Sequence, residues 1–298
     1  MTDGGTGDYL TGRAALAGVM GWPVGHSLSP RLHGFWLRQH RIDGAYLPLA
    51  VAPDRLEQAL RALPAMGFRG VNLTIPHKEP ALALVDRVTP AAARIGAINT
   101  VIVGQDGLLG DNTDGYGFME NLAAGAPGWQ AAAGPAVLLG AGGAARSVAV
   151  ALIDAGTPEL RLVNRTPARA EALAAQLADA ARARGAALTV LPWQDPHSLA
   201  GARLLVNTTS LGMSGQPALA IDLAVLPAEA LVTDIVYNPL ETGLLAAARK
   251  RGHRTVDGLG MLLQQAGFGF RKWFGGDPRV TPELRALIEA DIVAKTPK

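Results

Sequence analysis

The sequence predicts an α/β protein of two domains, the second of which is a Rossmann-type, doubly wound parallel sheet. The first observation is the segment 135–154, PAVLLGAGGAARSVAVALID, in which four apolar residues run into a glycine-rich turn and then into an alanine-rich stretch. The second is that strand-like and helix-like stretches alternate along most of the chain, which is typical of parallel sheets covered by helices.

The glycine-rich turn has the spacing G-x-G-x-x-A and lies between a strand buried on both faces and the start of a helix. Glycines let the backbone approach an anion, and the N–H groups and dipole of the helix face it, so this order suits the pyrophosphate of a dinucleotide. A purely structural strand–helix turn remains the alternative. The candidate cofactor residues are Gly140, Ala141, Gly142, Gly143 and Ala144.

Composition excludes several classes of function. The 298 residues include 49% hydrophobic residues, enough for about two folded domains. The absence of cysteine excludes disulfides, thiolate catalysis and cysteine zinc sites, and the six histidines show no ligand spacing, so we expect no metal. With neither a leader-like start nor a membrane-length apolar run, we expect a cytoplasmic protein whose residues 1–13 fray. Its scattered +2 charge argues against nucleic acid or a membrane as partner.

Lysine is rare, and this singles out Lys78. Only five of the 27 basic residues are lysine, and the other four lie within the last 49 positions. A chain that otherwise uses arginine has a lysine where a proton must be released, because arginine stays charged. Lys78 is therefore a catalytic candidate.

The first domain begins with a strand followed by GWPVGHSLSP. Ser29 and Pro30 are typical of a helix start, and two hydroxyls two residues apart, Ser27 and Ser29, also suit a carboxylate at a helix N-terminus. Spacing alone favours the plain helix cap. The predicted elements of this region are strands at 14–20, 46–51 and 70–75, a helix near 53–66, a helical run to Asp86 and a short strand after Thr100.

Polar residues lie at the ends of these strands. Thr74 and Lys78 lie at the carboxyl end of the strand that Pro76 ends, at the sheet edge where open α/β sheets place ligands. Asn99 and Asp114 lie at the margins of apolar stretches, and Asp114 is equally well explained as a helix cap.

The strand after the glycine turn, 159–163, ends in NRTPAR. Dinucleotide folds that prefer NAD usually have an acid near this point for the ribose 2′-hydroxyl, whereas this chain has Arg165 and Arg169. Two guanidinium groups can hold a 2′-phosphate, so the position favours NADP. The alternative is that Thr166 and Pro167 merely start the next helix and the arginines are solvated.

Three further strands, a helix and a final strand complete this domain, and two helices follow. The polar strand ends 207–210 and 237–239 lie where a bound cofactor would run, and we expect the last two helices to pack back on the first domain. The predicted ranges are strands 187–191, 202–206, 231–236 and 254–257, and helices 240–251, 258–274 and 281–294.

Nine motifs in this order resemble those of the shikimate dehydrogenase family, from about Gly18 to Phe274. They are GWPVGHSLSP, GVNLTIPHK, GAINT, GDNTDGYG, GAGGAAR, NRTPAR, NTTSLGM, DIVYNP and DGLGMLLQQA. The resemblance implies domains at 1–117 for substrate, 118–257 for NADP and 258–298 for the returning helices, with the active site in the cleft between the lobes.

The resemblance also implies roles for single residues. Ser27 and Ser29 would hold the substrate carboxylate, and Lys78 with Asp114 would form the catalytic pair. The remaining substrate residues would be Thr74, Asn99, Tyr237 and Gln265, the last rather than Gln264 because it directly precedes the motif alanine. Asn164, Arg165, Thr166 and Arg169 would contact the adenosine phosphate, and Met213 and Gly258 would lie near the nicotinamide.

The activity implied is the reversible, NADPH-dependent reduction of 3-dehydroshikimate to shikimate in aromatic amino-acid biosynthesis. Two alternatives remain: a quinate/shikimate dehydrogenase of broader specificity that uses NAD or NADP, and a catalytically idle NADP-binding sensor. The sensor is disfavoured because Lys78 and Asp114 are both present. The sequence leaves the oligomeric state open, a homodimer included.

Overall fold

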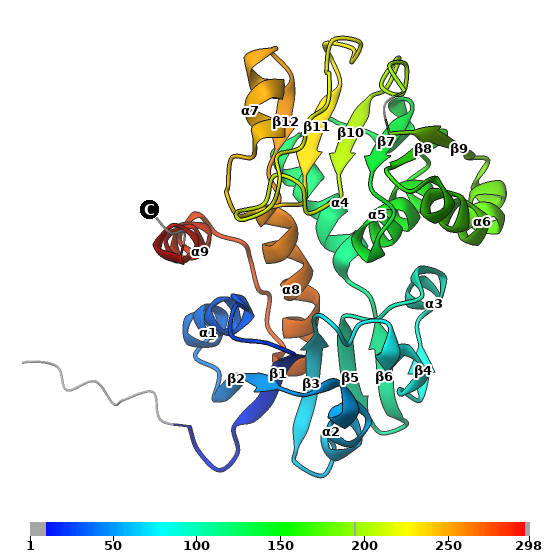
Figure 1. Cartoon of the computed structure of the whole chain (residues 1–298). Coiled ribbons are helices and arrows are strands. Elements are labelled where there is room, and N and C mark those ends of the chain that lie inside the picture. The colour runs from blue at the N-terminus through cyan, green and yellow to red at the C-terminus, as the bar shows by residue number, and fades with distance from the viewer. Residues whose placement is uncertain (1–9, 194, 296–298) are drawn as a thin grey trace, which may run out of the picture. The chain divides into compact units, whose positions relative to one another are not determined.

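The computed structural model describes residues 10–193 and 195–295 and divides them into two compact units, each with its own sheet (Figure 1). Of the described residues, the first unit takes those up to Thr89, 98–111 and 267–279, and the second takes 90–97, 112–266 and those from Val280 on. The units therefore interleave along the chain more often than the predicted division into 1–117, 118–257 and 258–298, in which only the last segment returns to the first domain.

The sheet of the first unit is mixed. Its strand order is β2-β1-β3-β5-β6-β4, as Figure 1 shows from left to right. β1 pairs in parallel with both β2 and β3, while β5 is antiparallel to β3 and to β6. The strands are β1 (Ala15–Gly21), β2 (Gly44–Ala50), β3 (Phe68–Leu73), β4 (Arg87–Val88), β5 (Thr100–Gly104) and β6 (Gly107–Asp111).

Helix α1 (Ser29–Gln39) buries Leu32 and Trp36 completely, and α2 (Leu56–Ala62) follows a 3₁₀ turn, η1 (Pro53–Arg55). The helical run expected up to Asp86 is wrong, since only a 3₁₀ turn, η2 (Pro80–Ala83), forms there. After this turn the chain joins the sheet instead of continuing as a helix: the Leu108 backbone N–H donates to the Asp86 carboxylate (2.7 Å), and β4 pairs with β6 from the next residue on.

Part of the tail that we expected to fray is held in place. Residues 1–9 of that tail lie outside the described residues, but the Thr11 backbone N–H donates to the Asp43 carboxylate (3.2 Å). Contacts with the rest of the first unit thus begin before the predicted position.

The second unit has the doubly wound sheet that the sequence predicts. All its strands are parallel, in the order β12-β11-β10-β7-β8-β9 (Figure 1), so the order reverses between β7 and β10. The strands are β7 (Ala136–Leu139), β8 (Glu159–Asn164), β9 (Ala187–Pro192), β10 (Leu204–Asn207), β11 (Leu231–Asp234) and β12 (Arg254–Val256).

Helices cover both faces of this sheet. Along β7, Ala136 and Leu138 join one apolar cluster and Val137 and Leu139 join the other, which confirms that this strand is buried on both faces. The first cluster contains α5 and α6, and the second contains α7. The helices are α3 (Pro90–Ile95), α4 (Asp114–Gly125), the 3₁₀ turn η3 (Ala131–Ala133), α5 (Gly143–Asp154), α6 (Pro167–Arg184) and α7 (Gly243–Lys250).

The last two helices differ in their partners. The unit boundary falls within α8 (Leu259–Phe274), so its second half belongs to the first unit, where the indole N–H of Trp273 donates to the Val101 carbonyl (3.1 Å). Helix α9 (Pro282–Lys295) belongs to the second unit, where Arg285 pairs with Asp257 (2.7 Å). Only part of this region therefore joins the first unit, contrary to the expectation for both helices.

Candidate functional site

The glycine turn after β7 leaves a bare helix N-terminus. Gly140 has φ of 109°, and a Cβ there would lie 2.9 Å from the Thr208 hydroxyl, so this position needs glycine. Gly142 caps α5 and Gly143 begins it, without any side-chain cap, and a Cβ at either would meet nothing within 4 Å. No N-cap side chain therefore occupies the first-turn N–H groups of α5, and the two glycines leave room for a close approach, which fits an anion such as a pyrophosphate.

The turn lies where this kind of sheet binds its ligands. The strand order reverses between β7 and β10, and such switch points open a crevice at the carboxyl ends of the strands. The Thr208 hydroxyl donates to the Leu139 carbonyl (2.8 Å), which fixes the loop after β10 against the end of β7. Ala141 packs on the core beneath the turn, and Ala144 lies in the first turn of α5.

The arginines that suggested NADP follow β8 on the same edge of the sheet. Asn164 ends β8, and its amide donates to the Thr166 carbonyl (2.8 Å), which shapes the turn into α6. Thr166 occupies the N-cap position of α6 without a side-chain hydrogen bond to the helix, and Pro167 is the first helical residue, as expected of a helix start. Arg165 and Arg169 are exposed, and neither forms an ion pair with any described residue. Their guanidinium groups are therefore placed to bind a phosphate from solution.

A polar group that the sequence analysis missed joins the next two strand ends. The Asp234 carboxylate, at the end of β11, accepts hydrogen bonds from Asn207 (2.9 Å), from the Val236 backbone (3.0 Å) and from Thr242 (2.7 Å). Burial raises the pKa of Asp234 from 3.8 to about 6, although the three hydrogen bonds act in the opposite direction. The aspartate of the DIVYNP motif was the available signal, and its role is to hold the loop ends in place.

Met213 and Gly258, expected near the nicotinamide, lie in loops that follow β10 and β12. Met213 is partly exposed (38%), and its backbone N–H donates to Ser210 (3.2 Å). Gly258 lies so close to the end of β11 that a Cβ would meet the Ile235 carbonyl at 2.5 Å. Close packing alone therefore requires glycine at this position.

In the first unit, Thr74 and Lys78 flank a tight turn at the end of β3. The Thr74 backbone N–H donates to Met20 of β1 (2.9 Å), and the His77 backbone N–H donates to the Thr74 carbonyl (2.9 Å). His77 also contacts the Val51 carbonyl through its ring (2.8 Å), and the Lys78 carbonyl accepts from Ile98 (2.8 Å). Both ends of the turn are thus tied to neighbouring strands or loops, and both side chains are half-buried.

The serines lie differently from the predicted cap. Leu28 occupies the N-cap position of α1 without a side-chain cap, and Ser29 is the first helical residue, so the interpretation of Ser29 as the cap is wrong. The Ser27 hydroxyl instead accepts from the Ser29 backbone N–H (3.3 Å). Both hydroxyls remain at a helix N-terminus, which suits a carboxylate.

Asn99 is almost fully buried (2%) just before β5. Its backbone N–H donates to the Asp111 carbonyl (2.9 Å), and its side-chain oxygen accepts from Thr100 (2.9 Å). Asn72 and Tyr46, which the sequence analysis did not single out, continue this hydrogen-bonded group.

The remaining candidates belong to the second unit. Asp114 is the first residue of α4, after Thr113 at the cap position, so Asp114 is not the cap itself. The Thr113 hydroxyl donates to the Gln265 side chain (3.2 Å), which brings Gln265 of α8 beside the start of α4. Burial raises the pKa of Tyr237, which follows β11, so its phenol keeps its proton. Lys78 and Asp114 lie in different units.

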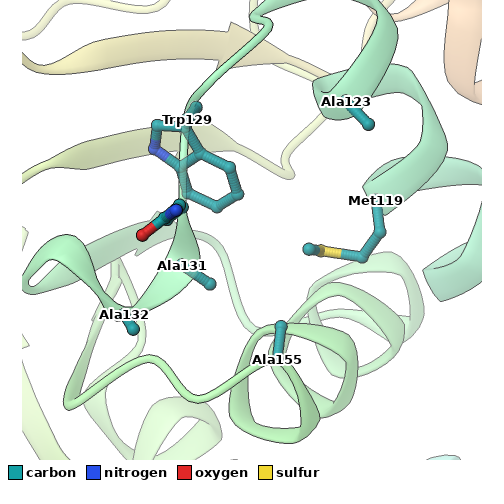
Figure 2. A pocket seen from close by; sticks show the side chains of 7 residues that line it. Met119, Ala123, Trp129, Ala131, Ala132 and Ala155 are labelled. Carbon is teal, nitrogen blue, oxygen red and sulfur yellow. The ribbon is translucent and has the colours of Figure 1, made fainter.

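A hollow of about 360 Å³ in the second unit contains none of the predicted site residues. Figure 2 shows the side chains that line it. It is lined mainly by apolar side chains of α4, among them Met119, of η3 and of the end of α5, and by Trp129 in the loop between α4 and η3. Within 10–193 and 195–295, no three acidic or histidine side chains cluster as metal ligands would, and no helix has the length and apolarity of a membrane span.

The parallel sheet, its reversal of strand order and the bare glycine turn define a dinucleotide-binding α/β protein. Known proteins narrow this class. A family model described as the shikimate dehydrogenase substrate binding domain matches residues 19–101, and one described as shikimate / quinate 5-dehydrogenase matches residues 127–191. The chain belongs to the shikimate dehydrogenase family.

Full-length relatives support this membership. A protein of Rhodospirillum rubrum named shikimate dehydrogenase (NADP(+)) is 61% identical over 281 residues, which are 94% of this chain and 98% of the relative. Shikimate 5-dehydrogenase of Thermus thermophilus, solved in complex with NADP(H) and shikimate, has a TM-score of 0.80 and 38% identity, with 94% of this chain and 99% of that one covered. Quinate dehydrogenase of Corynebacterium glutamicum, solved in complex with NAD, has a TM-score of 0.84 and 32% identity, with 93% and 99% covered.

Proposed function

We propose that this chain catalyses the reversible, NADPH-dependent reduction of 3-dehydroshikimate to shikimate, a step of aromatic amino-acid biosynthesis. The observation that carries the proposal is the 61% identity, over 94% of the chain, to a relative named shikimate dehydrogenase (NADP(+)). A match of this length includes the segments of both units that contain the candidate residues.

The choice of NADP rests on this chain's own residues as well. Arg165 and Arg169 are exposed beside the edge at which Gly142 and Gly143 leave the α5 N-terminus bare. The pyrophosphate would bind Gly140, Gly142 and Gly143, and the 2′-phosphate would bind the two guanidinium groups. When bound, NADPH supplies the hydride.

Lys78 would stabilise and protonate the substrate oxygen. When a ketone is reduced, its oxygen gains negative charge and must acquire a proton, and a lysine ammonium can meet both needs. Asp114 would orient the ammonium and share in the proton transfer. A general acid of this kind contributes about 10²- to 10⁴-fold in rate.

The other candidates would bind the ring. Ser27 and Ser29, at the start of α1, would donate to the substrate carboxylate. The side chains proposed for the ring hydroxyls and the carboxylate are Thr74, Asn99, Tyr237 and Gln265. A cytoplasmic location and a homodimer are further proposals from the sequence alone.

The test is steady-state oxidation of shikimate and of quinate, each with NADP and with NAD. We expect activity with shikimate and NADP, and a loss of about 10²- to 10⁴-fold in kcat for Lys78→Ala with a smaller change in KM. Lys78→Arg is the matched control for charge: it keeps the positive charge but does not release a proton, so its kcat should stay well below that of the wild type. Normal turnover by either variant would contradict the role of Lys78.

A quinate/shikimate dehydrogenase of broader specificity is the second candidate. The quinate dehydrogenase of Corynebacterium glutamicum, solved in complex with NAD, has the same fold at 32% identity. Comparable rates with quinate or NAD would favour this candidate. Tight NADP binding without activity on either substrate would instead favour a sensor.

A further inference from the structure

A buried chain of hydrogen bonds crosses the sheet of the first unit and ends on Asn99. The Tyr46 hydroxyl donates to Asn72 Oδ1 (2.6 Å), and Asn72 Nδ2 donates to the Asn99 carbonyl (3.0 Å) and to Thr100 Oγ1 (3.1 Å). Thr100 Oγ1 in turn donates to Asn99 Oδ1 (2.9 Å). All four residues are at most 6% exposed. Tyr46 lies on β2 and Asn72 on β3, so the phenol reaches across the strand between them, β1.

In this series of hydrogen bonds, each group's role as donor or acceptor is determined by the group beside it. The Asn99 backbone carbonyl can only accept, so the Nδ2 end of Asn72 must face it. The Oδ1 end of Asn72 then faces Tyr46, which must donate. Burial raises the pKa of Tyr46 well above its ordinary value, so the phenol keeps the proton that it donates.

The donor and acceptor directions of these bonds also determine the orientation of the Asn99 side-chain amide. Because Thr100 Oγ1 accepts from Asn72, its own proton can go to Asn99 Oδ1. The Asn99 amide is planar, so its Nδ2 end is turned away from Thr100. The ring of Tyr46 is itself held by stacking on His33, with centroids 3.9 Å apart and planes 3° from parallel.

We propose that Tyr46, acting through Asn72 and Thr100, is a positioning residue that fixes which end of the Asn99 amide meets the substrate. This inference rests on the proposed function, in which Asn99 contacts a ring hydroxyl. Asn99 then presents a donor, Nδ2, to a hydroxyl oxygen. A reversed amide would present an acceptor there. Its Nδ2 would then face Thr100 Oγ1, which already accepts from Asn72, and the Thr100 proton would lose Asn99 Oδ1 as its acceptor.

The test compares Tyr46→Phe, Thr100→Val and Thr100→Ser by steady-state kinetics with shikimate and NADP. Tyr46→Phe and Thr100→Val each remove one hydroxyl at nearly constant shape, and we expect the KM for shikimate to rise about ten-fold, as for one lost hydrogen bond. The KM for NADP should change less than about two-fold. Thr100→Ser retains the hydroxyl and should restore the wild-type KM for shikimate. Thr157→Val, which removes a buried hydroxyl of the second unit outside this chain of bonds, is the control.

Asn99→Ala separates positioning from general support of the fold. If Tyr46 acts through Asn99, Tyr46→Phe should raise the KM for shikimate by less than about two-fold when Asn99 is already alanine. A full ten-fold rise in that background, or an unchanged KM in Tyr46→Phe alone, would overturn the role of Tyr46 while the wild type remains active. A wild type inactive on both shikimate and quinate would overturn the proposed function and this role with it. Should Tyr46→Phe fail to fold, the contrast between Thr100→Val and Thr100→Ser decides in the same way.

Discussion

A single buried histidine should make the stability of this protein depend on pH. His33, on α1, is completely buried among the rings of Trp36, Tyr46, Phe270 and Trp273. Burial lowers its pKa from 6.5 to about 3, because the charged form loses its hydration and gains no partner among the described residues. The unfolded chain therefore takes up a proton at a pH at which the folded protein does not.

The size of the effect follows from the two pKa values. Since the folded pKa is the lower one, the stability is complete above pH 6.5 and is lost as the pH falls from 6.5 towards 3. Each pH unit in this window costs about 1.4 kcal/mol, so the loss at pH 5 amounts to about 2 kcal/mol relative to pH 8. That is a large fraction of the stability of a typical domain.

Urea unfolding followed by circular dichroism at pH 8, 6.5 and 5 measures this loss. In His33→Phe an aromatic ring of similar size remains beside Tyr46 but cannot be protonated, so its free energy of unfolding should fall by about 2 kcal/mol less than that of the wild type between pH 8 and 5. His197→Gln removes an exposed histidine and is the control, expected to follow the wild type. Parallel losses in the wild type and His33→Phe would refute the reasoning.

Four further outcomes follow from the second unit. The pKa of Asp234 is about 6 in the folded protein and 3.8 in the unfolded chain, so protonation favours the folded state. Between pH 7 and pH 4 the free energy of unfolding of the wild type should therefore rise by about 2 kcal/mol relative to that of Asp234→Asn, as measured by the same urea unfolding experiment. Arg165→Ala should raise the KM for NADP by about ten-fold and leave that for NAD nearly unchanged, whereas an equal rise for both would indicate a structural arginine. Gly140→Ala should lower the melting temperature through a cost of about 1–3 kcal/mol, because its φ of 109° disfavours a side chain. Gly142 has φ of −92° and open space where a Cβ would lie, so Gly142→Ala should preserve the melting temperature. The same variant should weaken NADP binding in a titration. Weaker binding without a loss of stability would distinguish Gly142 from Gly140.

The second unit was the more predictable of the two from sequence. Its strands are short apolar runs bounded by glycine or polar residues, and the central ones are buried on both faces, so hydrophobicity alone marks them. The four apolar residues expected as a strand before the glycine turn are those of β7. A helix does start after Thr166, at Pro167, and it ends at Arg184 with Gly185 in the left-handed conformation.

Helix α4 shows why other elements were missed. It opens with DGYGF, and two glycines in the first turns are unfavourable for a helix by about 1 kcal/mol each. Their reason is tertiary: a Cβ at Gly115 would lie 2.9 Å from the Ser147 carbonyl, and one at Gly117 would lie 2.6 Å from the Gln265 Cβ. Local propensity could not indicate packing against α5 and α8. Likewise β6 depends on its antiparallel pairing with β5.

The candidate site likewise contains residues that the sequence could indicate and residues that it could not. Residues such as Lys78, Asp114 and Arg165 follow the ends of apolar stretches, where polar side chains are conspicuous in the sequence. Tyr46 and Asn72 instead lie within strands, and their contact depends on the strand order β2-β1-β3, which nothing in the sequence led us to expect.

Asn72 nevertheless carried a signal that sequence alone could have used. It lies within the otherwise apolar end of β3, and an amide buried there is tolerated only if its donors and its acceptor are all paired. Each pairing requires a further polar group, Tyr46 on one side and Thr100 on the other, so the polar residues of such a group depend on one another. A single polar residue inside an apolar strand therefore indicates a hydrogen-bonded group that crosses the sheet. In this unit that group ends on Asn99, so the same bonds that satisfy the core also orient a side chain of the proposed substrate site.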